Sequence, residues 1–138
     1  MNSELLKLYA SIEKAKKHFD FYRKQIASVK SLYERAMQAK QVQLCPNLLL
    51  GEDHEAIYFK LDEIDRDCLV GFWMIGLIER NINSNPKKAA RHFGNFKSFF
   101  SKHAKKIAAL DLKLNKLFEK IALLQKIGYL SSSSEDGV

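Results

Sequence analysis

Two long stripes of apolar residues, spaced alternately three and four residues apart, constrain the fold of this chain most strongly. The first stripe comprises Leu5, Leu8, Ile12, Ala15, Phe19, Tyr22, Ile26, Val29, Tyr33 and Ala36. The second comprises Ala89, Phe93, Phe96, Phe100, His103, Ile107, Leu110, Leu114, Leu117, Ile121 and Leu124. This spacing keeps one seam of a helix turned toward a neighbouring helix. It therefore predicts two long coiled-coil-like helices and a mainly all-α fold.

Local start and stop signals set the expected bounds of these helices. The first helix is expected at about 3–43, because Pro46 prevents its continuation. The second is expected at about 86–128. Pro86 suits the first turn of a helix, and Gly128 suits the position just after the last turn.

The chain between the two long helices is expected to contribute a shorter one. Residues 62–81 fit a helix that is apolar nearly all round after Cys68, which predicts that it is buried. Residues 47–61 favour a small β-hairpin, and a short helix fits nearly as well. Residues 1–130 are expected to form one helical-bundle domain, followed by a flexible Ser-rich acidic tail at 131–138.

Basic residues beside the stripes predict the relative direction of the two long helices. One row flanks the first stripe and another flanks the second: Lys16, Arg23 and Lys30, and Lys106, Lys113 and Lys120. A parallel pair of helices would set these two rows against each other, whereas an antiparallel pair would not. The sequence therefore predicts that the two long helices are antiparallel.

Charge is distributed unevenly along the chain, whose net charge is +7. Residues 1–44 and 82–130 are rich in Lys and Arg, and residues 45–81 carry an excess of Asp and Glu. The acidic middle is expected to pack against the basic helices and neutralise part of their charge. The remaining positive charge is available to solvent or to an anionic partner.

Composition indicates a cytoplasmic protein. Two cysteines, Cys45 and Cys68, without metal or redox spacing, fit a reducing compartment. The first residues do not resemble a secretory signal, and the longest apolar run, 68–78, is too short to span a bilayer. No membrane insertion is expected.

The stripes favour a non-enzymatic interaction module, such as a scaffold, an adaptor or a protein that inhibits its partner. The antiparallel order would leave the first half of the first helix and the last half of the second as a coiled-coil-like stalk. Two helices alone seldom cover seams this wide, which predicts self-association or binding of another helical protein at this stalk. The residues expected to form this partner seam are Leu5, Leu8, Ile12, Leu114, Leu117, Ile121 and Leu124.

Nucleic-acid binding is the alternative. Basic residues crowd the start of the last helix, where the helix dipole disfavours cations unless an anion is bound, and RNA or DNA phosphate is the obvious candidate. The expected contacts are Lys87, Lys88, Arg91, Lys97, Lys102, Lys105, Lys106, Lys113, Lys116 and Lys120. A solvated lysine face explains the same residues without any ligand.

An enzyme or metal site around the acidic segment 52–67 is a weaker alternative. His54 lies among the acids of this segment, but neither calcium-loop nor zinc-ligand spacing is present. We therefore expect no catalytic residue, no metal and no cofactor.

Overall fold

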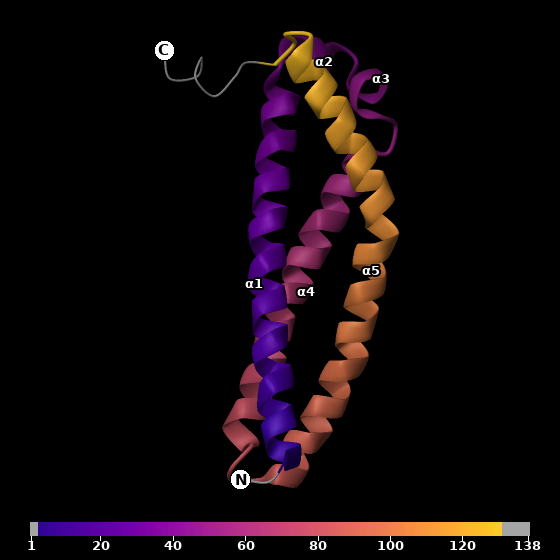
Figure 1. Cartoon of the computed structure of the whole chain (residues 1–138). Coiled ribbons are helices and arrows are strands. Elements are labelled where there is room, and N and C mark those ends of the chain that lie inside the picture. The colour runs from indigo at the N-terminus through magenta and orange to yellow at the C-terminus, as the bar shows by residue number, and fades with distance from the viewer. Residues whose placement is uncertain (1–2, 131–138) are drawn as a thin grey trace. The chain divides into compact units, whose positions relative to one another are not determined.

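A computed structural model describes residues 3–130 of the chain, so the expected tail at 131–138 lies outside the described residues. The helices are α1 (Ser3–Gln38), α2 (Lys40–Leu44), α3 (Pro46–Leu50), α4 (His54–Asn81) and α5 (Pro86–Lys126), shown in Figure 1. The part of the chain that the structure describes contains no strand, which confirms the mainly all-α fold. Of the two alternatives for residues 47–61, the β-hairpin is wrong and the helical one is confirmed, because α3 and the first turns of α4 occupy this segment.

The first predicted helix is interrupted near its end. Ala39 has an extended backbone, with φ −71° and ψ 132°, and separates α1 from α2. Pro46 then stands in the first turn of α3, so it both ends one helix and begins the next.

The helix α4 begins earlier than predicted, because it carries an apolar stripe of its own. The stripe comprises Ile57, Leu61, Ile64, Cys68, Gly71, Ile75 and Ile78, again at alternating steps of three and four, and it continues to Ile82 just after the end of α4. Every member is buried. Short-range alternation around Phe59 suggested a strand, but this longer helical period decides the structure.

The described chain divides into two compact units. Unit 1 comprises the chain up to Gln25 together with Glu63–Lys106, and unit 2 comprises Ile26–Asp62 together with the chain from Ile107 onward. Each unit therefore contains a part of α1, of α4 and of α5, and unit 2 also contains α2 and α3.

The predicted antiparallel order of the two long helices is wrong. Within unit 1, Leu8 near the start of α1 lines the same hollow as Ala89 near the start of α5. Farther along both helices, the Nε2 atoms of His18 and His103 lie 3.2 Å apart. The two helices therefore run parallel in unit 1, and their later parts also share one direction within unit 2 (Figure 1).

The ion pairs give the physical reason for this error. Basic residues beside the stripes pair with acidic residues of α4 instead of facing each other. The pairs are Lys16–Glu79 (2.7 Å), Arg23–Asp65 (3.2 Å), Lys106–Glu63 (2.9 Å) and Lys106–Asp67 (3.1 Å) in unit 1, and Lys30–Asp62 in unit 2. The expected partial neutralisation of the basic helices by the acidic middle is thus confirmed. It offsets the repulsion at Lys16, Arg23, Lys30 and Lys106, and Lys113 and Lys120 stay exposed to solvent.

Aromatic packing forms the core of unit 1. Phe19 is fully buried, and its ring lies against those of Phe72 and Phe100, with centroid distances of 5.6 and 5.7 Å. Gly71 permits this arrangement, because a Cβ atom there would lie only 2.4 Å from the Phe19 ring. The close approach of α4 to α1 therefore depends on the absence of a side chain at position 71.

Candidate partner-binding groove

The predicted stalk is wrong, because the first half of α1 and the last half of α5 belong to different units. Most of the predicted partner seam is buried by packing inside the units. Ile12 in unit 1 and Leu117, Ile121 and Leu124 in unit 2 are buried, whereas Leu5 and Leu8 in unit 1 and Leu114 in unit 2 are partly exposed. Packing within each unit therefore accounts for the buried members without a partner. The partly exposed members in unit 1 belong to a groove.

The walls of this groove are the parallel first parts of α1 and α5. Two adjoining hollows, of about 480 and 390 Å³, share Ser11 and Phe93. We define the α1–α5 groove by the residues that line them: Glu4, Leu5, Lys7, Leu8, Ser11, Lys14, Ala15, His18, Ile82, Pro86, Ala89, Ala90, Phe93, Phe96, Lys97, Phe100 and Ser101. Leucine, alanine and phenylalanine side chains make most of its floor.

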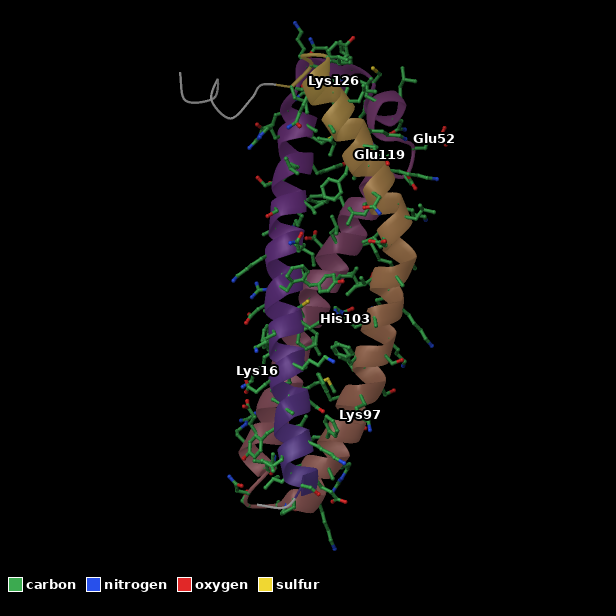
Figure 2. All side chains as sticks on the ribbon, in the orientation of Figure 1. Lys16, Glu52, Lys97, His103, Glu119 and Lys126 are labelled. Carbon is green, nitrogen blue, oxygen red and sulfur yellow. The ribbon has the colours of Figure 1, made fainter. Side chains whose placement is uncertain are left out.

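Lysines stand on both walls of the groove. Lys7 and Lys14 of α1 and Lys97 of α5, which is labelled in Figure 2, are all exposed. The ammonium of Lys97 lies 5.2 Å from the centroid of the Phe93 ring, a distance at which a cation–π attraction acts. Among the described residues that line the groove, Glu4 at its beginning is the one acidic residue.

A histidine pair lies at the far end of the groove. His18 lines the groove, and His103, labelled in Figure 2, is only 1 % exposed. One of their facing Nε2 atoms donates to the other. Nδ1 of His103 has no hydrogen-bond partner within residues 3–130, although it lies 3.9 Å from a carboxylate oxygen of Asp67. Burial lowers the pKa of both imidazoles, and the nearby His18 lowers the pKa of His103 further.

The residues predicted to contact nucleic acid fall into different environments. In unit 1, Lys87, Lys88, Arg91, Lys97, Lys102 and Lys105 are exposed, and in unit 2 Lys113, Lys116 and Lys120 are exposed. Lys106 differs, because it is only partly exposed and is held between two carboxylates of α4. At the start of α5, the side chain of Asn85 already accepts a hydrogen bond from the backbone amide of Lys88.

His54, the centre of the weaker alternative, is buried in unit 2. Its Nε2 donates to Oδ1 of Asn47 at 2.9 Å, so its Nδ1 accepts the hydrogen bond from the Tyr33 hydroxyl at 2.7 Å. Both ring nitrogens are thus engaged in holding α1, α3 and α4 together. Across residues 3–130, no group of three or more His, Cys, Asp or Glu side chains is placed to hold a metal ion.

Sequence reasoning missed an exposed apolar surface on α4. Leu69, Val70 and Trp73, all in unit 1, are 46, 44 and 62 % exposed, so the predicted burial of this helix on all sides is wrong. The heptad stripe of α4 is the signal that would have found this surface, because it assigns these three residues to the side away from the core.

Comparisons with known proteins identify no relative: no family, no curated protein and no solved structure matches this chain. Within residues 3–130, no helix combines the length and the apolar character needed to cross a membrane. The function must therefore be argued from the geometry of the groove and the surfaces around it.

Proposed function

We propose that this chain is a non-enzymatic interaction module in which the α1–α5 groove of unit 1 receives an amphipathic helix from a partner protein. The observation that carries this proposal is the apolar floor between two parallel helices. Grooves of this kind bind the apolar face of a helix through residues spaced three and four apart. A partner helix bound along the α1–α5 groove would convert the three-helix packing of unit 1 into a four-helix arrangement.

The aromatic side chains of the floor supply the binding energy in this account. Phe93 and Phe100 are each partly exposed beside the buried Phe96, so large apolar surfaces already meet at the groove. Aromatic side chains with restricted motion often dominate the affinity of protein interfaces. Phe93, which belongs to both hollows, is the expected centre of the contact.

The proposal is tested by filling the groove without reversing its charge. A display library of amphipathic helical peptides is selected on the full chain, and the binders are then measured against Ser11→Arg. Ser11 is exposed and belongs to both hollows, so a long side chain there blocks the floor. The matched control is Ser98→Arg, at an exposed serine of α5 outside the groove.

We expect Ser11→Arg to weaken the selected peptides by about tenfold or more, while Ser98→Arg leaves their affinity unchanged. Circular dichroism checks that both variants remain helical. Peptides that bind the two variants equally well would contradict the proposal, as would a library that yields no binder.

A second candidate function is binding of a polyanion such as RNA or DNA. In unit 1, six exposed cations of α5 have no ion pair with any residue that the structure describes: Lys87, Lys88, Arg91, Lys97, Lys102 and Lys105. Binding that weakens steeply with salt, and is lost when Lys87, Lys88 and Arg91 are changed to Glu, would support this function. No retention of nucleic acid at low salt would remove it.

A further inference from the structure

We propose that the helix received by the α1–α5 groove is acidic, with Asp and Glu on both sides of its apolar stripe. This inference rests on the proposed function, and it adds the chemical class of the partner. The observation behind it is that Lys7 and Lys14 on the α1 wall and Lys97 on the α5 wall line the apolar groove.

The positions of these lysines match the repeat of a helix. Lys7 and Lys14 are separated by two helical turns, so they stand in one row along the α1 wall, about 10 Å apart. Lys97 stands on the α5 wall and lines the same hollow as Lys14. An acidic residue repeated every seven positions in a bound helix would meet the α1 row at both lysines.

The lysines of the groove differ from those that face α4. Lys16 and Lys106 already pair with carboxylates of α4 in unit 1. Among the residues that the structure describes, Lys7 and Lys14 form no ion pair, and Lys97 contacts only the Phe93 ring through its charge. The charge of these three side chains is thus available to a ligand, whereas Lys16 and Lys106 are already paired with carboxylates of α4.

A second copy of this chain is a poor occupant. The chain carries a net charge of +7, and the acidic residues of α4 in unit 1 are largely engaged in ion pairs within their own unit. Placing another α1 or α5 over the groove would bring lysine rows together, which costs free energy at an interface. An acidic helix of a different protein meets the same apolar floor without this repulsion.

The test compares two designed peptides that share one apolar heptad stripe. In one peptide the flanking positions are all Glu, and in the other they are all Lys. Each peptide carries a fluorescent label, and its affinity for the full chain is measured by anisotropy at low salt and at about 0.5 M salt. We expect the Glu peptide to bind about tenfold more tightly at low salt, with the difference shrinking as salt is added.

Charge reversal in the chain sharpens the test. The double variant Lys14→Glu, Lys97→Glu should remove or invert the preference for the Glu peptide. The control Lys24→Glu, Lys102→Glu makes the same change in net charge at exposed residues outside the groove, and it should preserve the preference. Both variants are checked for helicity by circular dichroism.

The outcomes separate this inference from the proposed function. Equal affinity for both peptides, lost for both in Ser11→Arg, would overturn the acidic partner and leave the helix-binding groove intact. Tighter binding of the Lys peptide would overturn it as well. If neither peptide binds below about 100 µM, the proposed function itself fails, and the inference fails with it.

Discussion

The two units each bury a histidine, but they satisfy it differently. In unit 2, His54 uses both ring nitrogens in hydrogen bonds to Tyr33 and Asn47. In unit 1, Nε2 of His103 is hydrogen-bonded to His18, and its Nδ1 has no hydrogen-bond partner among the residues that the structure describes. A buried polar group with all its bonds made stabilises a fold, whereas an incompletely satisfied one weakens it. The buried histidine of unit 2 is therefore expected to stabilise its surroundings, whereas that of unit 1 makes the stability of unit 1 more sensitive to protonation.

The units also differ in the polarity of their surface hollows. Unit 2 has a hollow of about 660 Å³ lined mainly by polar side chains, among them Arg35, Gln38 and Lys40. Unit 1 has the apolar α1–α5 groove. Water solvates the polar hollow well, but an open apolar groove gains free energy when a partner covers it. The difference explains why we place binding in unit 1.

The largest expected effect is that of Phe19→Ala in the core of unit 1. Phe19 is fully buried against rings from α4 and α5, so its removal should lower the free energy of unfolding by about 3–5 kcal/mol. Urea denaturation measures the loss, and hydrogen exchange should locate it in unit 1. Phe21→Ala is the matched control, because Phe21 lies on the same helix and is 56 % exposed. Equal losses in the two variants would contradict the packing described.

In unit 2, the hydrogen bonds of His54 should contribute less to stability than the core of unit 1 does. His54→Leu should lower the free energy of unfolding by about 1–3 kcal/mol, because it leaves the Tyr33 hydroxyl and the Asn47 side chain without their partner. Urea denaturation measures the loss in His54→Leu and compares it with that in Tyr33→Phe, which removes only the hydrogen bond between Tyr33 and His54. A variant as stable as the wild type would show that the hydrogen bonds of His54 do not hold unit 2 together.

Acidification should affect unit 1 through its histidine pair. Because burial lowers the pKa of His18 and His103 in the folded state, the unfolded chain binds more protons than the folded chain below the ordinary histidine value of 6.5. Stability should therefore be fully present near pH 7.5 and should fall as the pH decreases through 6.5 toward 5. Protonation of both rings would also place two like charges 3.2 Å apart at their Nε2 atoms.

This pH dependence is measured by urea denaturation of the wild type and of the double variant His18→Gln, His103→Leu. The variant should lose most of the decline between pH 7.5 and 5, whatever its stability at neutral pH. Hydrogen exchange over the same range should show protection decreasing first in unit 1. A decline that is unchanged in the variant would assign the proton uptake to other groups.

The smallest expected effects come from the ion pairs, which occur in both units. Lys16→Met in unit 1 and Lys30→Met in unit 2 should each lower stability by at most about 1 kcal/mol, because these pairs are partly exposed and screened by water. Thermal denaturation at low and high salt measures the loss, which should shrink as salt is added. A much larger loss in either variant would mean that the ion pairs, more than the apolar cores, hold the helices together.

The sequence predicted the helices best where the signals are local. The stripes and the Asn85–Pro86 start signal gave the long helices and the beginning of α5, because they depend only on neighbouring residues. The direction of the helices depends on which helix faces which, and a row of lysines does not reveal that. Lys16 and Lys106 avoid each other by facing Glu79 and Asp67 of α4, an outcome visible only once three helices are packed.

The groove was beyond sequence reasoning for a related reason. Phe93 and Phe96 belong to the heptad stripe, so their spacing indicates packing but does not say whether a neighbour covers them fully. In unit 1, α4 covers one side of the parallel pair, and the side formed by Ser11, Phe93 and Phe100 stays open. The apolar stripe of α4 was present in the sequence and would have predicted both its start and its exposed Trp73.

Nuclear magnetic resonance can map where an amphipathic helix binds on this chain. The backbone amide signals of the isotopically labelled full chain are recorded by nuclear magnetic resonance while the Glu-flanked amphipathic peptide is added. The account predicts shifts concentrated in the first parts of α1 and α5, including Ser11, Ala90 and Ser101, which line the groove. Shifts centred on the exposed face of α4 around Trp73, or within unit 2, would contradict it.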